Sequence, residues 1–124
     1  MKTISRLLVV AISAGLVLIP ANSLADTKRF RAAGQPGSFR WEPTVRRIFK
    51  RDRIVWRNPT GVSHTVTAYR GRWRKNTTIG PGERTAKRFR RVGRYKFRCT
   101  IPGHSSLQDG RCSGMCGTVR VRRR

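Results

Sequence analysis

Short runs that alternate apolar and polar residues recur along most of the chain. Tyr95, Phe97 and Cys99 lie two residues apart in one run, and Val119 and Val121 have the same spacing near the end of the chain. Side chains two residues apart lie on the same face of a β-strand. Each run therefore predicts a strand with one buried face.

Turn-forming residues separate these runs at short intervals. Asn58-Pro59-Thr60-Gly61 precedes a run rich in strand formers, Thr65-Val66-Thr67-Ala68-Tyr69, and Pro81-Gly82 marks a later turn. No long stretch repeats with the period of a helix. Several short strands with turns between them predict an all-β sandwich.

The first 25 residues have the pattern of a secretory signal peptide. Lys2 and Arg6 precede an apolar core from Leu7 to Ile19, which is too short to span a bilayer. Ser23-Leu24-Ala25 offers small residues at the two positions that signal peptidase reads, so we expect cleavage before Asp26. The alternative is an uncleaved anchor. We expect an exported protein, periplasmic or at the cell exterior, with no transmembrane segment after cleavage.

The next segment, residues 26–38, combines basic residues with Gly34, Pro36 and Gly37, which disfavour regular structure. It is interpreted as a flexible basic arm. The remaining residues, 39–124, are predicted to form one domain, because the chain of 124 residues has room for no more. We expect this domain to be monomeric.

The chain carries 29 Lys and Arg residues against five Asp and Glu residues, a formal net charge of +24. Loss of Lys2 and Arg6 with the signal peptide would leave 27 of these 29 basic residues and a charge of +22. The outward positions of predicted strands include Arg88, Arg90, Lys96, Arg98, Arg120 and Arg122. Such faces can be merely solvated, which also discourages edge-to-edge aggregation.

The single sign of this charge nevertheless favours an anionic partner. Outside the cell, that partner is expected to be an acidic redox protein or an anionic cell-envelope surface, and no nucleic acid is expected in vivo. Five acidic residues leave little for general acid–base catalysis, and the sequence shows no catalytic triad pattern. We interpret the protein as a non-enzyme.

Four potential metal ligands lie around the strand pattern. Cys99 ends one alternating run, His104 follows it, Met115 leads into the next run, and His64 lies far upstream. Beyond residue 25 the chain has no other histidine or methionine. A thiolate, two imidazoles and a thioether are the ligand set of a type 1, or blue, copper site, in which the methionine is a weak axial ligand.

The motifs around these residues resemble cupredoxins of the plastocyanin/azurin type over residues 39–121. The matching segments are Val55-Trp56-Arg57-Asn58, Ser63-His64-Thr65-Val66-Thr67-Ala68, Ile79-Gly80-Pro81-Gly82-Glu83, Val92-Gly93-Arg94-Tyr95-Lys96-Phe97-Arg98-Cys99 and Met115-Cys116-Gly117-Thr118-Val119-Arg120-Val121. Each is weak alone, but their order and spacing are specific.

The resemblance implies a Greek-key β-sandwich of the cupredoxin type that transfers single electrons. It also implies one mononuclear copper ion held by His64, Cys99, His104 and Met115. The gap between His104 and Met115 is longer than is usual in the family. Gln108 lies nearer the azurin-like spacing, and because a glutamine can be axial, Gln108 is the alternative to Met115.

Two further cysteines, Cys112 and Cys116, lie in or next to this gap. Outside the cytosol they could form a disulfide, and otherwise they are free thiols. A different interpretation joins them with Cys99 and His104 in a Cys3His zinc set, which would make the protein a zinc-stabilised polyanion-binding module. Copper storage or delivery is a third interpretation of the chain, and a copper-free cupredoxin fold used only for binding is a fourth.

Overall fold

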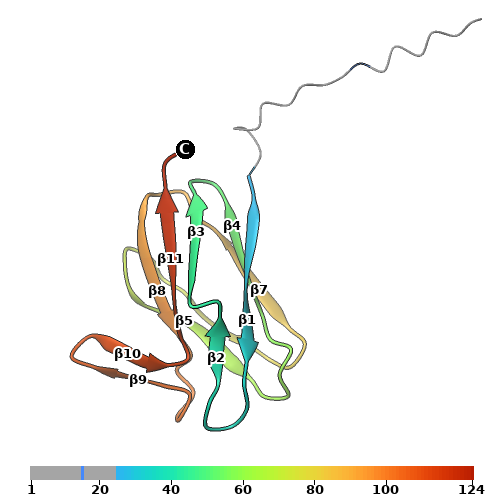
Figure 1. The fold of residues 1–124 in the computed structure, drawn as a ribbon, viewed down its shortest axis with the longest axis vertical. Coiled ribbons are helices and arrows are strands. Elements are labelled where there is room, and N and C mark those ends of the chain that lie inside the picture. Colours follow the sequence, from blue (N-terminus) through green and yellow to red (C-terminus); the bar gives the residue numbers. More distant parts are fainter. Residues whose placement is uncertain (1–14, 16–24) are drawn as a thin grey trace, which may run out of the picture.

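The computed structural model describes residue 15 and residues 25–124, so most of the predicted signal peptide lies outside the described residues. These residues form β-strands joined by turns and loops (Figure 1). The strands are β1 (Thr27–Ala33), β2 (Arg40–Glu42), β3 (Val45–Phe49), β4 (Arg53–Arg57), β5 (His64–Arg70), β6 (Asn76–Ile79), β7 (Arg84–Arg88), β8 (Gly93–Arg98), β9 (Ser105–Gln108), β10 (Arg111–Gly114) and β11 (Cys116–Arg122). No helix in this part of the chain has the length and apolar character that a membrane span needs.

Two sheets face each other and form a sandwich. One sheet has the strand order β2-β1-β4-β7, and the other has the order β3-β11-β8-β5-β6. The pairs β1–β4 and β3–β11 are parallel, and the other pairs are antiparallel. Consecutive strands such as β3 and β4 belong to different sheets, so the chain repeatedly crosses from one sheet to the other. The all-β sandwich predicted from the alternating runs is confirmed.

Aromatic side chains fill the space between the sheets. Phe97 is fully buried on β8, and its ring centroid lies 4.8 Å from that of Phe30 and 5.3 Å from that of Trp56. Tyr95 and Cys99 are buried on the same face of this run, as the two-residue period predicts. Because aromatic rings bury large areas in fixed geometries, this core supports the ends of the strands rigidly.

The predicted flexible arm, residues 26–38, is wrong for most of its length. Residues Thr27–Ala33 form β1, which pairs with β2 on one side and with β4 on the other. Phe30 and Ala32 have exposed fractions of 0% and 1%, and they alternate with outward basic residues. Their burial explains the order of this segment, and the domain therefore begins at β1 and not at Phe39.

Different strand termini lie at the two ends of the sandwich (Figure 1). The beginning of β5, the end of β8 and the beginning of β11 lie at one end, because β8 is antiparallel to both of its neighbours. The beginning of β1, the end of β3 and the C-terminus lie at the other end. The first end carries the candidate metal ligands.

Candidate metal centre

Three of the four predicted ligands converge at this end of the sandwich. The ligand atoms of His64, Cys99 and His104 all lie within 4.8 Å of one another. His64 Nδ1 lies 3.2 Å from His104 Nδ1, and Cys99 Sγ lies 3.4 Å from His104 Nδ1 and 3.9 Å from His64 Nδ1. Two imidazole nitrogens and one sulfur thus form a nearly equilateral triangle.

This triangle has the size that a metal ion requires. An ion in the plane of the three atoms, about 2.0 Å from each nitrogen and about 2.3 Å from the sulfur, would place them about 3.5–3.7 Å apart. The three observed separations, 3.2, 3.4 and 3.9 Å, lie on both sides of this value. The donor set is soft sulfur with imidazole, which suits copper in both of its common oxidation states.

His64 is the first residue of β5 and is completely buried. Its Nε2 atom lies 2.7 Å from the hydroxyl oxygen of Thr60, which leaves Nδ1 directed at the other two ligands. Burial, and to a smaller degree the positive charge of His104, lower the pKa of His64 to about 4. The imidazole is therefore neutral near pH 7, which is the form that binds a metal ion.

The loop before His64 is held by the buried side chain of Asn58. Its amide group donates hydrogen bonds to the carbonyl oxygens of Val62 and Ile79, at 2.7 and 3.0 Å. Its side-chain oxygen accepts hydrogen bonds from the backbone and the hydroxyl group of Thr60, at 3.0 and 2.6 Å. Asn58 thus fixes Thr60, and Thr60 orients the imidazole of His64.

Cys99 directly follows β8 and is also fully buried. The backbone N–H of Thr65 donates to its Sγ atom at 3.3 Å. Its own backbone N–H donates to the carbonyl oxygen of Met115 at 3.0 Å, and the hydroxyl group of Ser105 donates to its carbonyl oxygen. The sulfur therefore has a fixed position and accepts a hydrogen bond from a backbone N–H.

His104 lies in the loop after Cys99 and is partly exposed, unlike His64. Its backbone N–H donates to the carbonyl oxygen of Ile101 at 3.0 Å. The ring of Phe39 packs against both imidazoles, with a centroid separation of 4.8 Å from each. Phe39 thus restricts the rotation of both rings and excludes water on that side.

The two candidate axial ligands lie in different surroundings. Met115 is completely buried, and its backbone joins the other ligand segments, because its N–H donates to the carbonyl oxygen of His104 at 2.8 Å. Gln108 is exposed at the end of β9, where it pairs with Arg111. Gly114 allows the close approach beside Met115, since a Cβ atom there would lie 2.6 Å from the carbonyl oxygen of His104.

The long gap between His104 and Met115 forms the hairpin β9–β10, which projects from the sandwich (Figure 1). Asp109 and Gly110 form its turn, with φ angles of 51° and 74°, as in a two-residue type I′ turn. Cys112 on β10 forms a disulfide with Cys116, the residue after Met115. The only free cysteine of the described residues is Cys99, so this pairing leaves the alternative Cys3His zinc set without two of its thiolates.

The sequence interpretation missed three contributors to this site. Thr60 and Phe39 contact the histidine rings. The backbone N–H of Thr65 donates to Cys99 Sγ, and its hydroxyl oxygen accepts a hydrogen bond from the backbone N–H of Thr100, next to Cys99. The available signal for Thr60 was the presence of a hydroxyl residue directly after Asn58-Pro59 and four positions before His64. The position of Phe39 depends on the packing of β2 against the ligand loops, which no local pattern indicates.

The sequence and the fold were both compared with known proteins. Residues 29–122 match the model of a family of copper-binding proteins, the plastocyanin/azurin family. No curated protein sequence matches the chain.

Among solved structures, a purple cupredoxin from Nitrosopumilus maritimus has a TM-score of 0.61 and 16% sequence identity, over 76% of this chain and 98% of that protein. A reduced Cu(I) form of an amicyanin variant gives 0.60 with 20% identity, over 81% of this chain and 87% of that protein. A copper-containing nitrite reductase from Thermus scotoductus gives 0.60 with 20% identity, over 82% of this chain but 23% of the enzyme. These similarities confirm the predicted cupredoxin fold.

Proposed function

The chain belongs to the plastocyanin/azurin family of copper-binding proteins, and on this basis we propose that it is an exported type 1 copper protein that carries single electrons between redox partners. The observation that carries the proposal is the triangle of His64 Nδ1, Cys99 Sγ and His104 Nδ1. We assign these atoms as the strong ligands and Met115 as the weak axial ligand, with copper as the cofactor.

Bound copper supplies one-electron redox chemistry, and the chain's own residues keep the ligand positions constant. The backbone hydrogen bonds between Cys99, His104 and Met115 join the ligand segments to one another. Thr60 and Phe39 hold the imidazoles from outside. A ligand set that does not have to move between oxidation states favours rapid electron exchange.

Addition of Cu(II) to the exported, copper-free protein tests the proposal. We expect one copper ion per chain and an intense blue colour, because a thiolate bonded to Cu(II) absorbs strongly in the visible range. Cys99→Ser is the matched control, since it keeps the size of the side chain and removes the sulfur. A colourless Cu(II) form of the unmodified protein would contradict the proposal.

Export and the absence of catalysis are parts of this proposal. The disulfide between Cys112 and Cys116 supports export, because such bonds form in oxidising compartments. A role as carrier and not enzyme is supported by the compact group of His64, Cys99 and His104, the one possible metal site found among the described residues. The nitrite reductase is a much longer protein, of which this chain matches 23%.

Copper storage or delivery remains the second candidate, because a partly exposed ligand such as His104 also suits the transfer of the ion itself. A direct measurement distinguishes electron transfer from copper delivery. A carrier exchanges electrons rapidly while its copper stays bound in the presence of a chelator. A delivery protein loses Cu(I) to an acceptor protein at a comparable rate.

The partner is proposed to be an acidic redox protein that docks on the outer face of the five-stranded sheet. Arg120 on β11 lies directly opposite Arg47 on β3 and Arg94 on β8, and like charges in register are unfavourable. We use the name cationic sheet face for Arg47, Arg94, Lys96, Arg98, Arg120 and Arg122. The ion pairs found among residues 25–124 involve none of them, so an anionic partner would relieve their repulsion. An anionic envelope surface is the alternative.

A further inference from the structure

A buried carboxylate lies at the end of the sandwich that is remote from the metal centre. Asp52, in the turn between β3 and β4, has an exposed fraction of 1% and is the only buried acidic residue of the described chain. Burial of a charged carboxylate is costly unless cations or hydrogen bonds compensate it. In a chain with five acidic residues, this position therefore calls for an explanation of its own.

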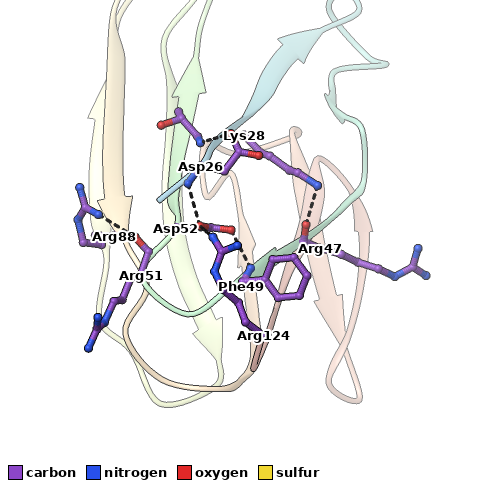
Figure 2. Close-up of polar contacts among 9 residues, drawn as sticks. Asp26, Lys28, Arg47, Phe49, Arg51, Asp52, Arg88 and Arg124 are labelled. Carbon is purple, nitrogen blue, oxygen red and sulfur yellow. Dashed lines mark hydrogen bonds and ion pairs between the residues drawn. The ribbon is translucent and has the colours of Figure 1, made fainter. Parts of the chain in front are cut away.

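Three groups from distant parts of the chain meet at this carboxylate (Figure 2). The backbone nitrogen of Asp26 lies 2.9 Å from its Oδ1 atom, and the guanidinium group of Arg124 lies 3.2 Å from the same oxygen. The backbone N–H of Phe49 donates to Oδ2 at 2.8 Å. Asp52 thus joins the beginning of β1, the end of β3 and the C-terminus.

The nitrogen of Asp26 is the atom that the predicted cleavage would release. Hydrolysis of the bond between Ala25 and Asp26 by a signal peptidase consumes one water and leaves a carboxylate on Ala25 and an ammonium group on Asp26. Before cleavage this nitrogen is a neutral amide. Cleavage would give it a positive charge, and in this structure it lies 2.9 Å from a buried carboxylate oxygen.

We propose that Asp52 is the binding site for the α-ammonium group that cleavage before Asp26 creates. The charge balance of the cluster supports this assignment. In the precursor, Arg124 is the cation paired with Asp52, and the carboxylate of Asp26 accepts a hydrogen bond from the backbone N–H of Thr27. Cleavage adds a second cation, and a charge-assisted hydrogen bond replaces a neutral one.

The surrounding backbone holds Asp26 in the position that pairing with Asp52 requires. The N–H of Arg53 donates to the carbonyl oxygen of Asp26 at 2.9 Å, and Thr27 is in register with Arg53 at the start of the β1–β4 pair. The ammonium group would therefore close the first strand onto the sheet. Cleavage would make the mature chain more stable than the same chain with residues before Asp26.

The experiment uses the exported, copper-loaded protein in three forms. One has the natural terminus, which mass spectrometry identifies. The second carries a short neutral extension before Asp26, and the third is acetylated at its α-amine. The natural and extended forms are also made with Asp52→Asn, and the folding equilibrium of each is measured by urea denaturation.

We expect mass spectrometry to find Asp26 as the first residue. The natural terminus should have a folding equilibrium constant about tenfold above that of the extended and acetylated forms, because hydrogen bonds to charged groups are stronger than neutral ones. With Asp52→Asn, most of this difference should disappear. If that variant does not fold, the comparison of the natural and acetylated termini still tests whether the α-ammonium group stabilises the protein.

Each contrary result has a separate meaning. A first residue other than Asp26 overturns the inference. Equal stability of the three forms would overturn the proposed pairing of the α-ammonium group with Asp52. The same holds if the extension lowers the folding equilibrium constant equally in chains with Asp52 and with Asp52→Asn. Neither result would contradict export. The inference rests on the proposed export but not on the copper chemistry, so a colourless protein with a tenfold effect would refute the proposed function alone. The visible spectrum should be the same in all forms, because the turn between β3 and β4, which contains Asp52, lies at the end of the sandwich opposite the metal centre (Figure 1).

Discussion

The Nδ1 atoms of His64 and His104 lie 3.2 Å apart, although 40 positions separate the two residues in the sequence. The two rings differ in their surroundings. His64 is completely buried at the start of β5, whereas His104 is partly exposed in a loop. If both imidazoles bind copper as proposed, this asymmetry decides which of them an external molecule can replace.

His104→Gly and His64→Gly should therefore respond differently to added imidazole. Removal of either side chain is expected to weaken copper binding, because each leaves an open position on the metal. Free imidazole should restore the blue spectrum of His104→Gly and should do so much less for His64→Gly, whose cavity lies in the core. Titration with imidazole at fixed copper concentration measures this difference. Equal restoration would show that burial does not control access.

Removal of the hydroxyl group that orients His64 should weaken copper binding without changing the ligands. In Thr60→Ala, the Nε2 atom of His64 loses its partner at 2.7 Å. Loss of such outer partners typically costs about 10–100-fold in metal affinity. Thr78→Ala, at an exposed position of β6, is the matched control and should leave the affinity unchanged. Competition with a copper chelator gives both values.

The ligand triangle was predictable because its residues lie at fixed places in the strand pattern. Cys99 continues the buried face of Tyr95 and Phe97, and His64 begins a run of strand formers. The resemblance to a known family then placed these residues in one site. The orientation of His64 by Thr60 was not predictable, since it depends on how Asn58 folds the loop.

The strand in the N-terminal segment was not predicted, although the alternation of apolar and basic residues indicated it. Gly34, Pro36 and Gly37 suggested a flexible arm, and the basic residues around Phe30 concealed a two-residue alternation. The hairpin β9–β10 was missed in the same way. Asp109-Gly110 is a strong signal for a two-residue turn, but the flanking serine residues lack the β-branched and aromatic character of typical strands.

The choice between Met115 and Gln108 leads to a matched pair of variants. Met115→Leu should keep the blue colour and raise the reduction potential, because an axial thioether binds weakly and tunes the metal. Gln108→Leu should change neither, since Gln108 is exposed in the projecting hairpin. Voltammetry of the two variants measures the potentials. A shift for Gln108→Leu alone would make Gln108 the axial ligand.

The integration of β1 into the sheet can be tested by its one large apolar residue. Phe30 is completely buried and packs against Phe97 and Trp56. Phe30→Ala should lower the free energy of unfolding by about 3–5 kcal/mol, as expected for a buried phenylalanine. Arg29→Ala, at the exposed neighbouring position, is expected to have little effect. A change near zero for Phe30→Ala in urea denaturation would mean that the segment behaves as a loose arm.

The positive charge of the protein should act mainly on the rate at which it meets its partner. Opposite charges accelerate encounter more than they tighten the final complex, and salt screens them over about 10 Å at 0.1 M ionic strength. Electron exchange with an acidic redox protein should therefore slow steeply as ionic strength rises. Exchange with a small neutral reagent should hardly change, and stopped-flow reduction measures both.

The same measurement locates the docking surface. Arg94→Ser on the cationic sheet face and Arg84→Ser on β7 of the other sheet each remove one exposed positive charge, so the two variants have the same net charge. If the partner docks on the cationic sheet face, Arg94→Ser slows the exchange and flattens its salt dependence more than Arg84→Ser does. Equal effects would mean that only the total charge attracts the partner. Flat salt profiles for the unmodified protein would mean that the arginines serve as a solvated coat.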